Sequence, residues 1–290
     1  MSPAKVNLFL QITGRRVDGY HNLFSLMCPV GLCDSLSLDV SAGDIRVICS
    51  DPDVPSDETN LAFQAADLFM KQFAGQHDAK RRGVKITIEK QIPVAAGLGG
   101  GSSNAAAVFW GLNRYFGRPF SMQELMDLGL ELGADVPFFI FGKPAFATGI
   151  GERLEPYHNL TPYYAVLIYP GIKVSTATVY KNLDLGLTKC KKKPKKSLLR
   201  HQAFDASLHL CNDLESVVIS RFPEIMDAKR ALLGQGAFGA LMSGSGSTVF
   251  GLFKDPAAAQ KAKNVLEENS SWKLFFTQLI VDDGFCIQEG

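Results

Sequence analysis

Residues 93–103 form a glycine- and serine-rich segment, Pro-Val-Ala-Ala-Gly-Leu-Gly-Gly-Gly-Ser-Ser, that separates two stretches of different periodicity. Before it, residues 84–88 alternate apolar and polar side chains, which predicts a half-buried strand. After it, residues 104–112 are alanine-rich and apolar, which predicts a buried helix. The chain is therefore expected to fold with a strand, a glycine loop and a helix in direct succession.

Such a unit suits the binding of phosphate groups. Glycine lets a ligand approach the main chain, and the first N–H groups of a helix carry partial positive charge. Ser102 or Ser103 is expected to cap the helix. The segment lacks the lysine of a P-loop, and the dinucleotide pattern G-x-G-x-x-G fails because Ser102 occupies its last position. A glycine-rich turn without a ligand is the alternative at this point.

Composition narrows the class of protein. The chain has 290 residues, of which 46% are hydrophobic and 20% charged, which suits one large or two modest domains. A net charge of +1 argues against nucleic-acid or membrane binding by the whole protein. The basic run at residues 189–196 is interpreted as a solvated loop, with attraction of an anionic substrate as an alternative.

Sequence features also bear on location. No apolar run is long enough to cross a membrane, and the N-terminus has neither a signal-peptide nor a transit-peptide pattern, so a cytoplasmic protein is expected. The six scattered cysteines form no C-x-x-C pair and are interpreted as reduced thiols, with a zinc site as the alternative.

Alternation of apolar and polar side chains predicts a strand at residues 4–12. The odd-numbered residues, Lys5 to Gln11, would share one face, and the even-numbered residues would share the other. Residues 36–40 and 45–49 are expected to pair as strands around residues 42–44. Residues 138–141 are expected to form a buried strand or turn.

Further patterns predict the remaining elements. Ser121 and Glu124 match a capping box, and Gly133 is expected to end the helix that follows. Helices are predicted at 60–73, 121–132, 175–183, 208–222, 224–235 and 255–269. Strands are predicted at 145–151, at 164–169, as a pair around a glycine–serine turn within 240–251, and at 274–281.

Three blocks of sequence resemble the GHMP kinases, the family of galactokinase, homoserine kinase, mevalonate kinase and phosphomevalonate kinase. The family loop is approximately P-x-x-x-G-L-G-(S/G)-S-(A/S)-(S/A), and residues 93–103 match it in register. The blocks are Pro3-Ala-Lys-Val-Asn-Leu-Phe-Leu10 continuing to Gly14 and Asp18-Gly-Tyr-His21, then residues 93–103 with Gly133-Ala-Asp-Val-Pro137, and then Met242-Ser-Gly-Ser-Gly-Ser-Thr248.

The resemblance implies an α+β two-domain GHMP kinase fold with ATP and substrate in the cleft between the domains. Residues 1–155 would form an N-terminal ribosomal-protein-S5-domain-2-like α/β domain that binds ATP, and residues 156–290 a C-terminal ferredoxin-like α/β domain. It also implies that backbone amides of the loop wrap the ATP phosphates. The loop residues are Pro93, Val94, Ala95, Ala96, Gly97, Leu98, Gly99, Gly100, Gly101, Ser102 and Ser103.

Loops of the family often carry Met-Gly or Gly-Gly after the proline, where this chain has Val94-Ala95-Ala96. These residues are also small, so the loop is expected to keep its role in phosphate binding.

The combination P-A-K-x-N-L, G-x-x-x-D-G-Y-H and G-A-D-V-P is similar to a narrower branch of the family. Enzymes of that branch use ATP to phosphorylate the 2-hydroxyl of a cytidylyl sugar alcohol in the non-mevalonate isoprenoid pathway. By this resemblance, Asp135 accepts or orients the attacking hydroxyl, and Lys5 polarises it. Each residue alone has a structural alternative, an edge lysine and a turn aspartate.

Substrate-binding roles also follow from the resemblance. Asn7 would bind the polyol end beside Lys5. Tyr20 would stack on the cytosine and His21 would hydrogen-bond to it, with Tyr180 as a second aromatic partner or a packing residue. The third block would place backbone amides near the transferred phosphate or the diphosphate, unless it is only a tight hairpin turn. Its residues in this role are Gly244, Ser245 and Gly246.

Mg²⁺ is expected to accompany ATP, with Ser103 and Asp135 as candidate ligands. Two other functions are left open. A kinase acting on homoserine or mevalonate is disfavoured by Tyr20 and His21, because those substrates have no base to stack. A nucleic-acid-binding module is disfavoured by the near-neutral net charge. The chain is expected to bind neither nucleic acid nor membrane, and to act as a monomer or homodimer.

Overall fold

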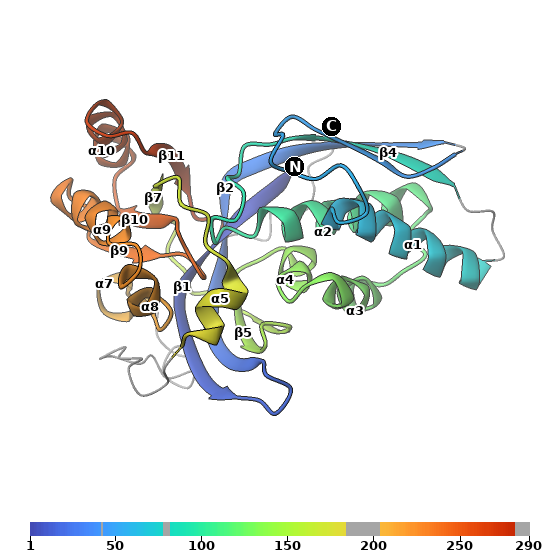
Figure 1. Ribbon diagram of the computed structural model, residues 1–290, viewed down its shortest axis with the longest axis horizontal. Coiled ribbons are helices and arrows are strands. Elements are labelled where there is room, and N and C mark those ends of the chain that lie inside the picture. The colour runs from blue at the N-terminus through green and yellow to red at the C-terminus, as the bar shows by residue number, and fades with distance from the viewer. Residues whose placement is uncertain (42, 78–81, 184–203, 282–290) are drawn as a thin grey trace.

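The computed structural model describes residues 1–41, 43–77, 82–183 and 204–281, arranged in two lobes (Figure 1). The larger lobe contains the N-terminal half of the chain. Its seven-stranded sheet contains β1 (Ser2–Arg15), β2 (His21–Ser41), β3 (Arg46–Cys49), β4 (Gly83–Glu89), β5 (Ala145–Gly149), β6 (Arg153–Pro156) and β8 (Cys211–Asn212).

The long strand β2 organises this sheet. Its first half pairs antiparallel with β1 and β5, and its second half pairs antiparallel with β4. Four helices lie on one side of the sheet (Figure 1). They are α1 (Leu61–His77), α2 (Gly100–Tyr115), α3 (Met122–Leu132) and α4 (Val136–Phe141).

The smaller lobe has a four-stranded antiparallel sheet in the order β11-β7-β10-β9. This order is the ferredoxin-like arrangement that was expected. Its strands are β7 (Tyr164–Tyr169), β9 (Gly239–Met242), β10 (Val249–Phe253) and β11 (Lys273–Gln278). Its helices are α5 (Thr176–Lys181), α7 (Ala206–His209), α8 (Glu215–Ile219), α9 (Glu224–Gly234) and α10 (Pro256–Glu268).

The chain crosses between the lobes more than once. Strand β8, from the C-terminal half, pairs in parallel with β1, and Leu279 forms a β-bridge with Val30. These contacts attach the smaller lobe to the main sheet. The division into domains at residues 155 and 156 stays a prediction.

A β-bulge in β1 changes which residues share a face. Asn7 pairs with Met27, whereas Phe9 pairs with the preceding residue Leu26, so Leu8 is an extra residue in the ladder. Phe9 therefore packs in the same hydrophobic cluster as Val6 and Leu8. The prediction that Lys5 to Gln11 would alternate regularly is wrong beyond Asn7, because an extra residue reverses the faces of the strand.

Three other predictions are wrong. Residues 36–40 and 45–49 do not pair, because β4 lies between β2 and β3. Residues 138–141 belong to helix α4, since a short apolar run does not distinguish a buried strand from a buried helix. Residues 208–222 contain α7, β8 and α8 instead of one helix, because pairing with β1 overrides local helix propensity.

The other predicted elements are confirmed. Ser121 caps α3 with both hydrogen bonds of the capping box, and Gly133 ends that helix. The predicted helices correspond to α1, α2, α3, α5, α9 and α10, and the predicted strands to β1, β4, β5, β7, β9, β10 and β11.

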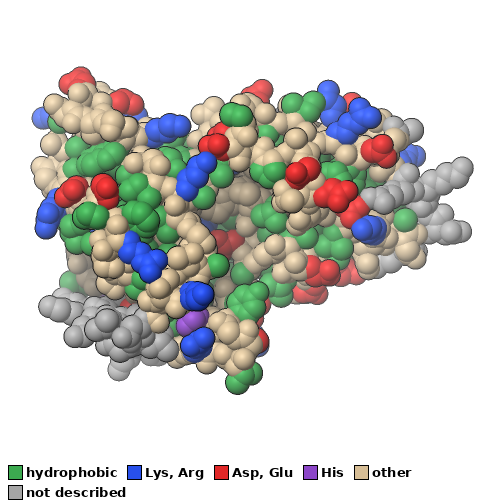
Figure 2. Space-filling model, in the orientation of Figure 1, with side chains coloured by type: hydrophobic (Ala, Val, Ile, Leu, Met, Phe, Trp, Pro, Cys, Tyr) green, Lys and Arg blue, Asp and Glu red, His purple; other side chains and the backbone are tan. Residues whose placement is uncertain are grey.

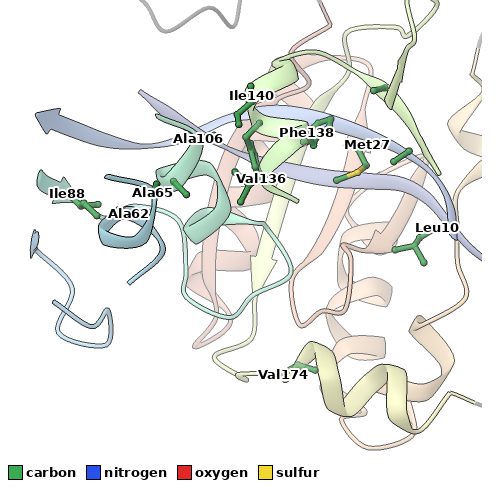
Figure 3. Packing of buried hydrophobic residues seen from close by; sticks show 14 of the residues in the cluster. Leu10, Met27, Ala62, Ala65, Ile88, Ala106, Val136, Phe138, Ile140 and Val174 are labelled. Carbon is green, nitrogen blue, oxygen red and sulfur yellow. The ribbon is translucent and has the colours of Figure 1, made fainter. Parts of the chain in front are cut away.

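Small side chains allow the helices α1 and α2 to pack closely against each other beside the sheet. Fully buried alanines line the contact between α1 and α2, and α4 adds aromatic and branched residues to the same core. Figure 3 shows this packing for Ala62, Ala65, Ala106, Val136, Phe138 and Ile140. Leu10 and Met27, from the paired strands β1 and β2, belong to the same cluster.

Among the cysteines that the structure describes, Cys211 differs from expectation. Cys28, Cys33 and Cys49 are free thiols, but Cys211 is disulfide-bonded, so the prediction of six reduced thiols is wrong there. Sequence spacing does not show which thiols a fold brings within bonding distance. Within the described ranges, no helix has the length and apolarity that a bilayer crossing requires.

The capping box of α3 gives a testable prediction. Ser121→Ala should lower the free energy of unfolding by about 1 kcal/mol, because the N–H of Glu124 loses its acceptor. Urea denaturation measures the change. Ser121→Thr keeps the acceptor and should retain most of the stability. An alanine variant as stable as the wild type would show that the cap contributes nothing.

Candidate active site

A cavity of about 1130 Å³ lies between the lobes, and Figure 2 shows the molecule hollowed at this place. Its walls come from segments far apart in the chain. They are parts of β1 and β2 with the turn between them, the glycine loop, the segment before α4, the helix α5 and the turn after β9. The fold therefore brings all three sequence blocks to one site.

The glycine loop before α2 has three residues with left-handed backbone, of which Ala95, at φ +54°, is the first. Gly97 has φ +77° and Gly99, the N-cap, has φ +71°. No side chain caps the helix, so the prediction that Ser102 or Ser103 caps it is wrong. Helix α2 begins at Gly100, before both serines, because glycine tolerates the left-handed N-cap conformation. Its first amides consequently lack a side-chain partner.

The second glycine–serine turn packs directly against the first. A Cβ atom at Gly97 would lie 2.2 Å from the carbonyl oxygen of Ser243. The Ser243 hydroxyl donates to the carbonyl of Gly97 at 3.0 Å, and the N–H of Thr248 donates to the carbonyl of Ala96 at 3.2 Å. The two turns therefore form one backbone-lined wall.

Lys5 occupies the centre of the site. Its backbone N–H donates to the carbonyl of Leu98 at 3.0 Å, which ties β1 to the glycine loop. Its Nζ donates to Asn7 Oδ1 at 2.7 Å and lies 3.6 Å from Asp135 Oδ2. Asn7 in turn donates to the hydroxyl of Ser25 at 2.9 Å. The ammonium group is thus fixed by two partners inside the protein.

Asp135 brings a carboxylate to the cavity from the start of α4. It is the N-cap residue but makes no capping hydrogen bond with its side chain. Its side chain is 38% exposed, whereas that of Lys5 is 5% exposed. The carboxylate is therefore the accessible member of the pair.

Three rings also line the cavity. The rings of His21 and Tyr180 are 5.5 Å apart, and Tyr20 is 61% exposed beside them. Burial lowers the pKa of His21, and the charge of Arg15 lowers it further. Burial raises the pKa of the Tyr180 hydroxyl, with a smaller contribution from Asp135. Both groups are therefore neutral near pH 7.

A buried polar cluster holds the two ends of the glycine loop together. Asp34, which has no exposed surface, forms an ion pair with Lys90 and accepts from the N–H groups of Gln91 and Ile92 at 2.8 and 2.9 Å. It also accepts from Asn104 in α2 at 2.9 Å. The motifs did not identify this carboxylate, because its partners lie 56 to 70 positions away.

Most residues predicted for the site line the cavity. They are Lys5, Asn7, Tyr20, His21, Pro93, Val94, Ala95, Ala96, Gly97, Gly99, Gly100, Gly101, Ser102, Asp135, Tyr180, Gly244 and Ser245. Three do not line it. Leu98 and Ser103 are buried, and the Ser103 hydroxyl accepts from Ser2 at 2.8 Å. Gly246 lies within the turn and donates to the carbonyl of Ser243.

The cavity also contains residues that the motifs did not identify. Arg15 and Lys181 contribute positive charge to the cavity. Arg15 is the strand partner of His21, and Lys181 follows Tyr180 in the chain. Asn60 lines the cavity next to α1. The Thr176 and Ser245 hydroxyls lie 2.7 Å apart and join α5 to the second turn.

Comparisons with known proteins agree with this geometry. Residues 60–143 match the family model of the GHMP kinases N terminal domain, and residues 195–271 match that of the GHMP kinases C terminal. A 4-diphosphocytidyl-2-C-methyl-D-erythritol kinase of Syntrophotalea carbinolica is 47% identical over 288 residues, 97% of this chain and 99% of the relative.

Two further matches are kinases whose names describe the same substrate. The 4-diphosphocytidyl-2-C-methyl-D-erythritol kinase of Pelobacter propionicus is 46% identical over 272 residues, 93% of this chain and 95% of the relative. A crystal structure of 4-(cytidine 5'-diphospho)-2C-methyl-D-erythritol kinase is 36% identical, with a TM-score of 0.77, over 96% of this chain and 97% of the other.

The contact between the two glycine turns gives a second prediction. Gly97→Ala should lower the free energy of unfolding by at least about 2 kcal/mol, because alanine is strained at positive φ and its Cβ would clash with the Ser243 carbonyl. Gly101→Ala is the matched control. Gly101 lies in the first turn of α2, where the nearest atom to an added Cβ would be 3.4 Å away. The unfolding temperature of this variant should therefore equal or exceed that of the wild type. Equal effects of the two substitutions would contradict the argument.

Proposed function

The chain belongs to the GHMP kinase family, and we propose that it phosphorylates the 2-hydroxyl of 4-diphosphocytidyl-2-C-methyl-D-erythritol with ATP, giving the 2-phosphate and ADP for isoprenoid precursor synthesis. The observation that carries this proposal is the Lys5–Asp135 pair, which lies in one cavity with the glycine loop and the Tyr20, His21 and Tyr180 rings.

The glycine loop binds the ATP phosphates in this proposal. The amides at the start of α2 lack a side-chain cap, and Gly99 to Ser102 line the cavity. Uncapped amides at a helix N-terminus stabilise negative charge. The loop is also held at both ends by the Asp34 cluster, so its backbone is organised before the nucleotide arrives.

The Lys5–Asp135 pair serves the acceptor alcohol. The 2-hydroxyl oxygen forms a bond to the γ-phosphorus, the bond from this phosphorus to the β,γ-bridging oxygen breaks, and ADP leaves. The carboxylate of Asp135 orients the hydroxyl and accepts its proton, since it is the exposed member of the pair. Lys5 polarises the same hydroxyl, and Asn7 fixes the Lys5 ammonium at 2.7 Å.

In this proposal, the rings of Tyr20, His21 and Tyr180 bind the cytosine. Tyr20 and Tyr180 offer flat faces for stacking, and a neutral His21 offers one ring N–H donor and one acceptor for the base edge. Homoserine and mevalonate have no group that would use these rings, so the alternative acceptors remain disfavoured.

Mg²⁺ is proposed to accompany ATP and to neutralise charge on its phosphates. Of the two candidate ligands, Asp135 fits this role, because its carboxylate reaches the cavity, while the Ser103 hydroxyl is bonded to Ser2 outside the lining. Among the described residues, no group of three His, Cys, Asp or Glu side chains could hold a metal ion. The ion would depend on phosphate oxygens and water for its other ligands. The cytoplasmic location and the oligomeric state stay predictions.

A coupled ADP-release assay with Mg²⁺ tests the function. The wild type should turn over the cytidylyl sugar alcohol but neither homoserine nor mevalonate. Asp135→Asn should reduce kcat at least about 100-fold, because the acceptor hydroxyl loses its proton acceptor. Asp127→Asn is the matched control, since Asp127 lies on α3 and bonds to Gln123. A higher rate of ADP release with homoserine or mevalonate than with the cytidylyl sugar alcohol would refute the proposal.

The environment of His21 predicts how cytidine binding depends on pH. Burial and Arg15 hold the pKa of His21 below its ordinary value of 6.5, so the imidazole stays neutral at pH 7 and becomes charged only in more acidic solution. The Kd for cytidine should therefore be constant above pH 7 and rise as the pH falls through this lowered pKa. His21→Gln should remove the rise. The same rise of the Kd toward acidic pH in the wild type and in His21→Gln would contradict the role of His21.

A further inference from the structure

The described part of the cavity contains four basic side chains, and two of them face carboxylates. The ammonium of Lys5 lies 3.6 Å from Asp135, and that of Lys90 is paired with Asp34. Both lysine side chains are only 5% exposed. Their charges are therefore largely compensated inside the protein and are not the main attraction for an anionic ligand.

Arg15 and Lys181 differ from these two lysines. Both are exposed, both line the cavity, and neither makes an ion pair within the described ranges. Asp18 also lines the cavity, but its carboxylate accepts from Arg16 Nε at 2.9 Å and from the N–H of Tyr20 at 3.1 Å. The nearest acidic group of the turn is thus bound to another arginine, which leaves Arg15 uncompensated.

Both cations are attached to the ring cluster. Arg15 is the strand partner of His21 across the β1–β2 ladder, and its charge is close enough to affect His21. Lys181 follows Tyr180 in the last turn of α5, and the Tyr180 ring lies 5.5 Å from the His21 ring. The two cavity cations that have no ion pair among the described residues therefore border the site proposed for the base.

We propose that Arg15 and Lys181 bind the diphosphate of the cytidylyl substrate. This inference rests on the proposed function, in which the substrate has its diphosphate between the base and the sugar alcohol. With the base on the rings and the alcohol at Lys5 and Asp135, the diphosphate must cross the part of the cavity between them. Two uncompensated cations at the base end supply the charge-assisted hydrogen bonds that a diphosphate requires.

This diphosphate subsite would also set substrate selectivity. A free nucleoside would gain the ring contacts alone, while a nucleoside diphosphate would gain the cations as well. Because Arg15 and Lys181 are exposed, their contribution should weaken as salt screens it.

Calorimetric titration with cytidine and with cytidine 5'-diphosphate, without ATP, tests the inference. The wild type should bind the diphosphate about 10-fold or more tightly than the nucleoside at low salt. In the double variant Arg15→Gln and Lys181→Gln, the Kd values for cytidine and for cytidine 5'-diphosphate should differ by no more than about threefold. The Kd for cytidine at pH 8 should change less than about twofold relative to the wild type. Raising the salt concentration should reduce the ratio in the wild type and barely change it in the variant.

The control removes the same two charges elsewhere. Lys71→Gln with Arg153→Gln replaces one lysine and one arginine that are exposed and lie outside the cavity lining. This variant should keep the wild-type ratio of affinities. In turnover, the double variant at Arg15 and Lys181 should raise KM for the cytidylyl substrate and leave KM for ATP unchanged.

The outcomes distinguish this inference from the function on which it depends. A wild type that binds neither ligand would overturn both. A wild type that binds both, with an unchanged ratio in the double variant, would overturn the diphosphate subsite and leave the kinase assignment standing. Parallel loss of cytidine and diphosphate binding in the variant would also overturn it, because it would show that the two side chains only support the ring cluster.

Discussion

The buried ammonium of Lys5 is the interaction on which the site depends. A charge with 5% exposure of its side chain must be paired, and Asn7 and Asp135 supply the partners. The backbone of Lys5 is bonded to Leu98 as well, so one residue joins β1, the glycine loop and the start of α4. A Cβ atom at Gly244 would lie 3.1 Å from Lys5 Nζ, so a glycine in the second turn makes room for the lysine. A Cβ atom at Gly99 would lie 2.8 Å from the Phe139 ring, so the glycine there makes room for that ring.

The same arrangement recurs at the entry to the glycine loop. Asp34 pairs with Lys90 and bonds to the chain just before the loop and to Asn104 just after it. A Cβ atom at Gly100 would lie 2.8 Å from Lys90 Nζ, so a second glycine makes room for a second lysine. Two compensated ion pairs thus fix the loop from both sides. In the proposed function, the phosphate groups are attracted by the helix amides and by the two cations that have no ion pair among the described residues.

Sequence patterns predicted what is local and missed what depends on long-range pairing. The glycine loop, the capping box of α3 and the Lys5–Asn7 face follow from residues close together in the chain, and the structure places them as predicted. The bulge at Leu8 was missed, because the consecutive apolar residues Leu8, Phe9 and Leu10 also suit a strand that is buried on both faces. No sequence pattern identified Asp34, because only the fold brings Lys90 to it. The roles of individual site residues cannot follow from the sequence, because a role depends on distances that the sequence does not contain.

In the proposed function, different segments of the chain carry the chemistry and the choice of substrate. Lys5 and Asn7 lie on a buried central strand, and α4 with Asp135 packs against the core, so changes there affect both folding and catalysis. Tyr20 and Arg15 lie at an exposed turn, and Tyr180 and Lys181 lie on the short helix α5. The turn is exposed and buries little apolar surface, whereas α5 contributes Val179 to the core. In the proposed function, substitutions at the exposed positions of the turn and of α5 would therefore change the preference for the acceptor and leave the Lys5–Asp135 pair in place.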